Sequence, residues 1–189
     1  MYKTATFLVN HFWGQPSRMA DSLGVLLLTW NQAFYRYGLF DFQQLENCLA
    51  ANQSTLNLFR SRNIVSYSPD EAPTIRALFD QFLNALRICE GTKKGVSSPV
   101  AVAKALHLLA PSFFPLWDAE IAKGYGCRYG NRAAETYISF LLKMKRFAER
   151  LQTPIDGQLM EKPLLKLIDE YNYARFTKGW VQASQTEGR

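Results

Sequence analysis

The sequence predicts an all-α protein. Apolar residues recur every three or four positions over most of the chain, which is the spacing of one buried helix face. Hydrophobic residues make up 48% of the 189 residues, enough to bury one sizeable core or two small lobes that share an interface. Strand patterns are confined to two short segments, residues 6–9 and 64–67. The helical period therefore dominates, and no internal repeat interrupts it.

Capping residues and glycines divide this pattern into helices. Ser17 and Asp41 can each accept hydrogen bonds from the first free amides of a helix, and Gly38 favours a stop between them. Ser68 is followed by Pro69 and two acidic residues, which is typical of a helix start. In order, the expected helices cover about residues 18–37, 42–51, 54–61, 69–89, 99–109, 118–124, 131–151 and 161–176.

Charge and cysteine content narrow the classes of function. The chain carries 22 Lys and Arg against 16 Asp and Glu, a net charge of +6, so a polyanion such as nucleic acid is a reasonable partner. The chain has two histidines and three widely separated cysteines, Cys48, Cys89 and Cys127. This set predicts neither a disulfide framework nor a metal site of regular spacing, so we expect the cysteines to be buried thiols. No run approaches the ~20 apolar residues of a membrane span, and the first residues lack the pattern of a signal peptide. We therefore expect a cytoplasmic protein without membrane contact.

A glycine-containing turn joins two expected helices near residues 91–98. Glycines permit close backbone approach, and the free amides at the start of the following helix favour an anion. The residues that would grip a nucleic-acid backbone there, without reading its sequence, are Lys93, Lys94, Gly95, Ser97 and Ser98. The alternative is an ordinary turn between helices with solvated lysines.

The chain that follows this turn carries a more specific pattern. Gly-Val at 95–96 leads into a helix rich in small residues and then into FPLWDAEIAKGYG at 114–126. This order resembles the helix-hairpin-helix superfamily of DNA glycosylases, in which a hairpin and a helix precede a proline turn with a catalytic aspartate. Asp118 follows Gly95 by 23 residues, which is close to the family's interval. Weaker matches extend the resemblance over about residues 20–130, at 25–32, 45–49, 58–64 and 75–86.

The resemblance implies a single two-lobed glycosylase module, a monomer with double-stranded DNA in the cleft between its lobes. One lobe would hold about residues 39–118, the other residues 1–38 with 119–178, and residues 181–189 would form a flexible tail. In a bacterium the protein would be associated with the nucleoid. Further basic residues would extend the phosphate-binding face, with a solvated helix face as the alternative: Lys123, Arg128, Arg132 and Lys143.

Departures from the family pattern limit what the resemblance implies. The hairpin reads Gly-Val-Ser at 95–97, so its second glycine is missing. The four clustered cysteines that hold an iron–sulfur cluster in some members are absent, so no cofactor is expected beyond a monovalent cation that the hairpin could hold. Bifunctional members carry a lysine nucleophile near the start of the second hairpin helix, where this chain has residues 97–100, SSPV, which implies a monofunctional enzyme. Lys104 is the alternative lyase residue. It lies five residues after Pro99, and about 500° of helical rotation turns its side chain away from the face of Pro99. This orientation favours a solvated or phosphate-contacting role for Lys104.

Asp118 is the predicted catalytic residue. Cleavage of an N-glycosidic bond builds positive charge on the sugar, which a fixed carboxylate can stabilise while it orients the attacking water. A structural helix cap is the competing role, and the two are compatible. Base extrusion also needs a pocket or wedge, for which the sequence offers Trp30, Asn31, Gln32, His107 and Trp117. For Trp30 and His107 the alternative is a place in the core.

These observations predict a DNA glycosylase that leaves an abasic site. By resemblance, its base could be a modified cytosine in phage DNA, removed in antiviral defence, or a lesion of the 8-oxoguanine type, removed in repair. A non-catalytic helix-hairpin-helix DNA-binding protein is the first alternative. An all-α interaction or toxin protein with an incidental hairpin is the second.

Overall fold

The structure is mostly helical, which confirms the all-α class. It is a computed structural model that describes residues 2–155 and 162–181, with side chains described up to residue 151 and again from residue 162. The α-helices are α1 (Tyr2–His11), α2 (Pro16–Trp30), α3 (Gln32–Tyr35), α4 (Phe42–Ala51), α5 (Gln53–Arg60), α6 (Ala72–Ala85), α7 (Pro99–Leu109), α8 (Ala119–Gly124), α9 (Ala133–Ile155) and α10 (Leu164–Asn172). The 3₁₀ turns η1 (Ile64–Ser66) and η2 (Pro69–Glu71), the π-helical turn η3 (Tyr173–Thr177) and the strands β1 (Gly38–Phe40) and β2 (Ile88–Gly91) complete the described elements.

Both strand predictions were wrong, and the strands that exist were missed. Residues 6–9 lie within α1, and residues 64–67 form η1 and its end. The observed strands pair antiparallel, with Gly38 opposite Gly91. They are only three and four residues long, so they offer too few positions for an alternating pattern to be recognised. Pairing of β2 also explains why the helix predicted to reach residue 89 ends at Ala85.

Helix starts were predicted better than helix ends. Asp41 caps α4 and accepts the amides of Gln43 at 2.8 Å and Gln44 at 3.3 Å. Ser68 and Glu71 form a capping box ahead of α6. The helix expected from residue 18 starts instead at Pro16, so Ser17 lies within it and does not cap it, and it breaks at Asn31, after which α3 begins.

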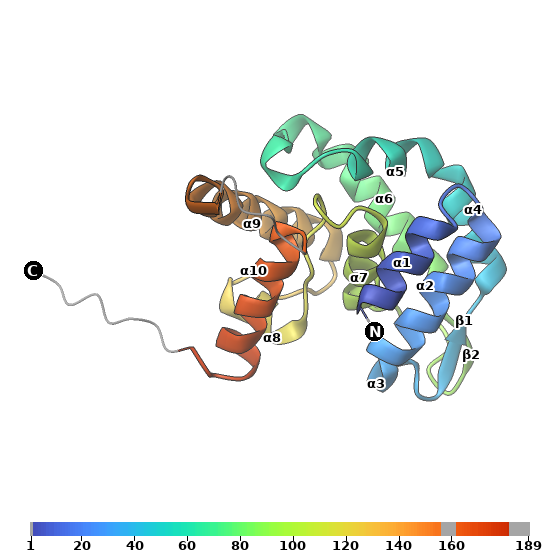
Figure 1. Cartoon of the computed structure of the whole chain (residues 1–189). Helices are drawn as coiled ribbons and strands as arrows, with labels where there is room; N and C mark the ends of the chain where they lie inside the picture. Colours follow the sequence, from blue (N-terminus) through green and yellow to red (C-terminus); the bar gives the residue numbers. More distant parts are fainter. Residues whose placement is uncertain (1, 156–161, 182–189) are drawn as a thin grey trace, which may run out of the picture.

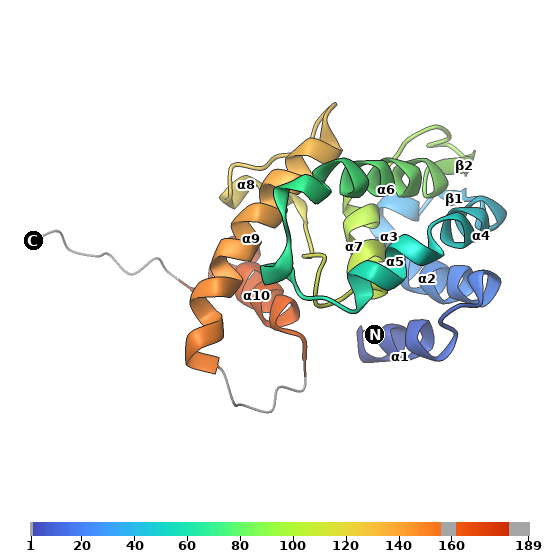
Figure 2. The same cartoon turned by 90° about the horizontal axis from the view of Figure 1, so that it is seen from above.

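Helix α7 lies at the centre of the molecule. Helices α1, α2 and α6 pack against it, and every residue from Ala101 to Leu109 is buried except Lys104, which is half-buried. Figures 1 and 2 place α8, α9 and α10 on one side of α7 and α1, α2 and α4 on the other. Because α1 and α2 pack against α7 and α2 also packs against α4, the first helices contact the central group. The predicted division into lobes, which joins them to the C-terminal helices, stays a prediction.

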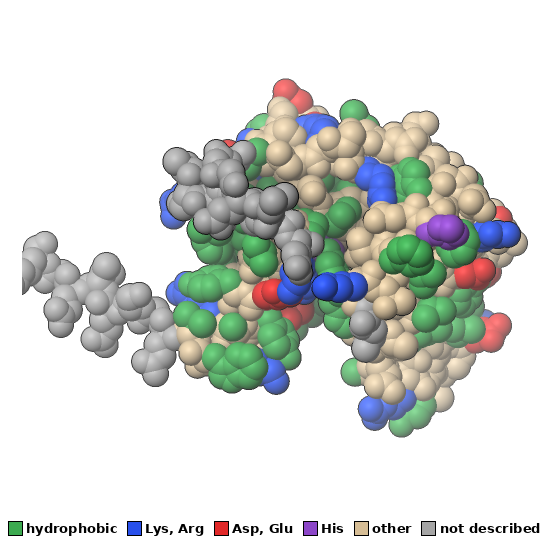
Figure 3. All heavy atoms as spheres, in the orientation of Figure 1, with side chains coloured by type: hydrophobic (Ala, Val, Ile, Leu, Met, Phe, Trp, Pro, Cys, Tyr) green, Lys and Arg blue, Asp and Glu red, His purple; other side chains and the backbone are tan. Residues whose placement is uncertain are grey.

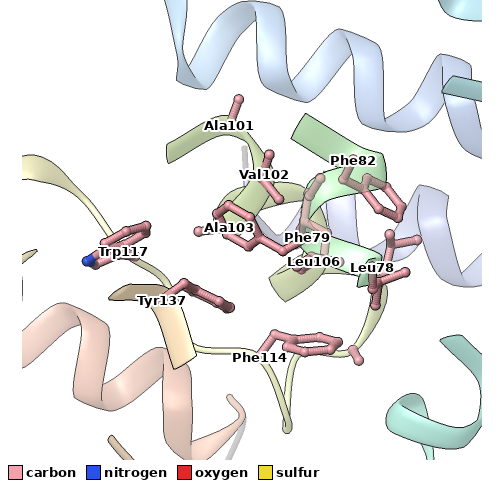
Figure 4. Close-up of a cluster of buried hydrophobic side chains, with 14 of the residues drawn as sticks. Leu78, Phe79, Phe82, Ala101, Val102, Ala103, Leu106, Phe114, Trp117 and Tyr137 are labelled. Carbon is pink, nitrogen blue, oxygen red and sulfur yellow. The ribbon is translucent and has the colours of Figure 1, made fainter. Parts of the chain in front are cut away.

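An aromatic cluster fixes the loop between α7 and α8. Tyr137 of α9 is fully buried between Phe79 and Trp117, with ring centroids 5.0 and 5.5 Å away. Its hydroxyl donates a hydrogen bond of 2.9 Å to the carbonyl of Pro115. Figure 4 shows Trp117 at one edge of this cluster and Phe114 at another. The segment that ends at Asp118 is therefore held by packing on both sides.

Other sequence predictions concern the cysteines and the chain ends. All three cysteines are free thiols, of which Cys127 is buried and the other two are half-buried. The tail expected to be flexible lies outside the described residues from 182 onward, and so does the start of the last predicted helix at residue 161.

Candidate active site

A pocket of about 590 Å³ opens beside Asp118. It lies where the end of α2, the middle of α7, the loop before α8 and one face of α10 and η3 come together. Figure 3 shows acidic and basic side chains side by side where this face of the molecule is hollowed. The pocket is lined by Trp30, Lys104, Leu116, Trp117, Asp118, Lys166, Asp169, Glu170, Tyr173, Ala174 and Trp180.

Asp118 caps α8 and lines the pocket at the same time. One carboxylate oxygen accepts the amide of Ile121 at 2.8 Å, as expected of an N-cap aspartate. The side chain is half-buried, so it is neither enclosed in the core nor fully solvated. The cap holds the carboxylate in one orientation at the pocket wall.

Lys104 enters the same pocket from α7. Its amine donates to the carbonyl of Trp30 at 2.8 Å and to Oδ1 of Asn31 at 3.3 Å, and it lies 5.3 Å from the Trp30 ring centroid. Burial lowers the pKa of Lys104 to about 8, against the opposing effect of the Asp118 charge. The expected solvated role was therefore wrong, whereas the phosphate-contacting role stays a prediction. Lys104 and Pro99 do line different depressions, but the face to which the rotation turns Lys104 lines the same pocket as Asp118.

An ion pair on α10 forms the opposite wall. The amine of Lys166 lies 2.6 Å from a carboxylate oxygen of Asp169, and both side chains are largely buried. Lys166 also lies over the rings of Tyr2 and Trp30, at 5.1 and 5.7 Å from their centroids. Burial raises the pKa of Asp169, Lys166 lowers it, and the charge of Asp118 raises it. The negative charge of Asp118 therefore acts on Asp169 across the pocket.

Sequence reasoning did not find the α10 wall. Its members Lys166, Asp169, Glu170 and Tyr173 stand at helical spacing, so they share one face of the helix. A polar stripe of this kind on a helix with an apolar opposite face is also the pattern of solvated surface. The signal was present, but it did not distinguish a pocket wall from an exposed face.

Three tryptophans, Trp30, Trp117 and Trp180, are among the aromatic side chains that line the pocket. Trp30 is half-buried, and its ring meets the edge of Tyr2 with centroids 6.1 Å apart. Trp117 is 1% exposed, and its Nε1 is buried with no hydrogen-bond partner among the described residues. In Figure 4 this nitrogen lies on the side of Trp117 away from the labelled cluster. A buried unpaired N–H is costly, so a ligand atom that accepts it would be favoured.

Three of the predicted pocket residues do not line the pocket. Asn31 accepts from Lys104 and donates to Oγ of Ser98 at 3.3 Å, so it joins α2 to the start of α7. Gln32 is exposed. His107 is fully buried: Nδ1–H donates to the carbonyl of Phe114 at 2.8 Å, and Nε2 accepts from the hydroxyl of Tyr2 at 3.0 Å. Burial lowers the pKa of His107 to about 4, and it is a core residue, as the alternative interpretation held.

In the turn that was predicted to bind phosphate, several backbone amides are already hydrogen-bonded to nearby carbonyls. Gly95 adopts φ of +88°, which requires glycine, and its amide donates to the carbonyl of Ile88 at 2.8 Å. The amides of Lys94 and Val96 are also bonded to carbonyls of this turn. These three amides therefore do not point at a phosphate, contrary to the simplest expectation for a hairpin of this kind.

Some side chains of the same turn bond to neighbouring elements of the protein, and others are exposed to solvent. Lys93 donates to the carbonyls of Ala33 and Phe34 at 3.3 and 3.4 Å, whereas Lys94 is exposed. Ser98 caps α7 by accepting the amide of Ala101 at 3.2 Å, and Ser97 is half-buried beside it. The other predicted phosphate contacts are spread over three separate depressions, with Lys123 and Arg128 in one, Arg132 in a second and Lys143 in a third.

The described part of the chain contains no group of three or more His, Cys, Asp or Glu side chains placed to hold a metal ion. Within the same residues, no helix combines the length and apolar character needed to cross a membrane. A scan against protein-family models, a search of curated proteins and a search of solved structures each find no match to this chain.

Proposed function

We propose that this protein is a monofunctional DNA glycosylase that cleaves the N-glycosidic bond of a damaged or modified base flipped out of DNA. The observation that carries the proposal is the position of Asp118, held by its helix cap at the wall of a pocket of about 590 Å³. That volume is within the range of small-molecule sites and accommodates a nucleobase with part of its sugar. The sequence pattern from Gly95 to Asp118 supports the same activity.

In this proposal Asp118 acts on the sugar, and the tryptophans act on the base. The carboxylate stabilises the positive charge that develops as the base leaves, and it orients the water that attacks C1′. Trp30 offers a ring face for stacking, and the buried N–H of Trp117 offers a donor to a carbonyl of the base. The DNA lies across a cleft between two helical lobes, with its backbone near the turn at residues 93–98.

The substrate class we propose is a modified base, with a modified cytosine of phage DNA as the first choice and an 8-oxoguanine-type lesion as the second. The size of the pocket supports a base larger than cytosine itself. A defence role makes a direct prediction: expression of the protein restricts phages whose DNA carries modified bases and spares phages with ordinary DNA. Restriction by an Asp118→Asn variant equal to that of the unaltered protein would contradict this role.

The biochemical test is incubation with genomic DNAs of differing modification, followed by mass spectrometry of the released bases. Asp118→Asn retains a side chain that caps helices as well as aspartate does, so the fold is preserved while the charge is removed. We expect base release to fall by a factor of about 10³ or more. Glu120→Gln is the matched control, because Glu120 is exposed on the same short helix and should not affect release.

The same experiment distinguishes a glycosylase from a non-catalytic DNA-binding protein. Such a protein would bind duplex DNA in a salt-sensitive manner, release no base from any DNA, and bind equally well as Asp118→Asn. An interaction or toxin protein would show no loss of DNA affinity when Lys93 and Lys94 are replaced by Glu.

A second candidate activity, cleavage of the abasic strand, is favoured by one observation. Lys104 lines the same pocket as Asp118, and its pKa of about 8 leaves a sizeable fraction of the amine neutral at slightly alkaline pH. A neutral amine can add to C1′ of the abasic sugar and lose water to give a Schiff base. Borohydride reduction would then trap a protein–DNA adduct. Trapping that disappears in Lys104→Met would establish this activity, and absence of trapping would support the monofunctional proposal.

A further inference from the structure

A second depression, between α9 and α10, has a chemical character different from that of the pocket. It has a volume of about 350 Å³ and lies over the face of α10 and η3 opposite to the pocket wall. Tyr171 and Arg175 face this depression, whereas Asp169, Glu170 and Tyr173 face the pocket. We call this depression the basic groove; its lining residues are Tyr125, Lys143, Arg146, Phe147, Arg150, Tyr171 and Arg175.

Positive charge is concentrated in the basic groove. Lys143, Arg146 and Arg150 stand at i, i+3 and i+7 on α9, so they form one stripe, and Arg175 faces them from η3. No carboxylate belongs to the lining among the residues that the structure describes, and no ion pair of these four cations occurs within them. Lys145 of the same helix differs, because its amine lies 3.7 Å from a carboxylate oxygen of Glu149.

Aromatic rings stand among these cations. Tyr171 is 37% exposed, and its ring meets that of half-buried Phe147 edge-on, with centroids 5.8 Å apart. A guanidinium nitrogen of Arg175 lies 3.3 Å from the hydroxyl of Tyr171 and orients the ring. Tyr125 closes the floor and donates its hydroxyl hydrogen to Asn172 at 2.8 Å. The groove therefore offers a partly exposed ring held in place beside four positive charges.

We propose that the basic groove binds a single strand of DNA. Interleaved cations and aromatic rings suit a strand whose phosphates contact Lys and Arg and whose unpaired bases stack on the rings. The stripe from Lys143 to Arg150 is about 10 Å long, which spans more than one phosphate of a strand. A duplex would keep its bases paired and leave the Tyr171 face unused. The site is separate from the pocket, and the inference does not rest on glycosylase activity.

Binding of a labelled oligothymidylate of about 15 nucleotides to the full chain, followed by fluorescence anisotropy over a range of salt, tests the proposal. Arg146→Gln should weaken binding and make the slope of log affinity against log salt shallower by about 0.7, the value for one lost phosphate contact on a single strand. Arg18→Gln is the matched control, because Arg18 is exposed on α2, outside the groove, and should leave affinity and slope unchanged.

The aromatic part of the proposal has its own pair of variants. Tyr171→Ala should lower the affinity about tenfold through loss of a stacking surface, whereas Tyr171→Phe keeps the ring and should lower it by less than about twofold. Equal effects of Arg146→Gln and Arg18→Gln would overturn the proposal. The proposal would also be overturned if a duplex of the same length bound more tightly than the single strand and depended on Arg146. Binding of a mononucleotide as tight as that of the strand would overturn it too. Base release by the Arg146→Gln variant is measured in parallel, so that a loss of strand binding can be told apart from a loss of the proposed glycosylase activity.

Discussion

At the scale of single residues, Trp117 joins the core to the pocket. Its ring packs among aromatic side chains, including Phe140 at a centroid distance of 6.2 Å, while its buried N–H finds no acceptor in the described part of the chain. An N–H left unpaired in the interior has a desolvation cost of about 1–3 kcal/mol. In the proposed glycosylase, the missing acceptor would be a carbonyl of the base beside Asp118.

Removing this donor should weaken substrate binding more than it harms the fold. We expect Trp117→Phe to raise KM for the modified substrate about tenfold, which corresponds to one hydrogen bond, with a smaller effect on kcat. Phe140→Leu loosens the same aromatic cluster but keeps the N–H, so it controls for altered packing. Steady-state kinetics of base release would decide, and an equal rise of KM in both variants would assign the effect to packing.

At the scale of elements, the strand pair and its turn depend on glycines in two different ways. Gly91 has φ of +94°, and a Cβ there would overlap the carbonyl oxygen of Tyr37, the residue that precedes β1. Gly95 has φ of +88°, but a Cβ there would meet no atom within 4 Å. The first glycine is required by both backbone conformation and close strand approach, and the second by backbone conformation alone.

These two glycines make a matched pair of variants. Gly95→Ala should destabilise the protein by about 1 kcal/mol, the cost of a left-handed conformation for alanine. Gly91→Ala should cost about 3 kcal/mol or more, because the strands must also separate. Urea denaturation of both variants measures the difference in the free energy of unfolding. Equal losses would mean that the close approach of β1 and β2 adds nothing to stability.

At the scale of the whole molecule, Lys104 couples the central helix to the N-terminal helices. Its amine bonds to the last residue of α2 and to Asn31, and it also faces the pocket formed with α10. Burial in this shared position disfavours the charged amine. The junction between the two sides of the molecule therefore contains a group whose protonation affects folding.

The consequence is a defined dependence of stability on pH. The pKa of Lys104 is about 8 in the folded protein and 10.5 in the reference state, so between these values the unfolded chain binds more protons. The free energy of unfolding should therefore increase as the pH rises from about 8, and the increase should be complete above pH 10.5. The full increase that Lys104 contributes is about 3 kcal/mol. Urea denaturation from pH 7 to 10.5 should show this rise relative to Lys104→Met. Parallel curves for the two proteins would contradict it.

Local chemistry in the sequence was sufficient to predict the helices other than α1 and α3, and the N-cap at Asp118. Caps such as Asp41 and Asp118 act on amides two or three residues away, and the apolar period is a property of one segment, so both can be recognised without knowledge of the fold. The short strands could not be recognised, because β1 and β2 are separated by nearly fifty residues and exist only as a pair.

What the sequence determined by itself is therefore an all-α chain with a capped aspartate after a proline turn, preceded by a glycine turn and a buried helix. Only the tertiary structure decided that Lys104 lines the same pocket as Asp118, that α10 forms a wall of this pocket, and that His107 lies in the core. Local signals depend on neighbours along the chain, whereas the pocket depends on side chains from Trp30 to Trp180, which packing of the helices alone brings together.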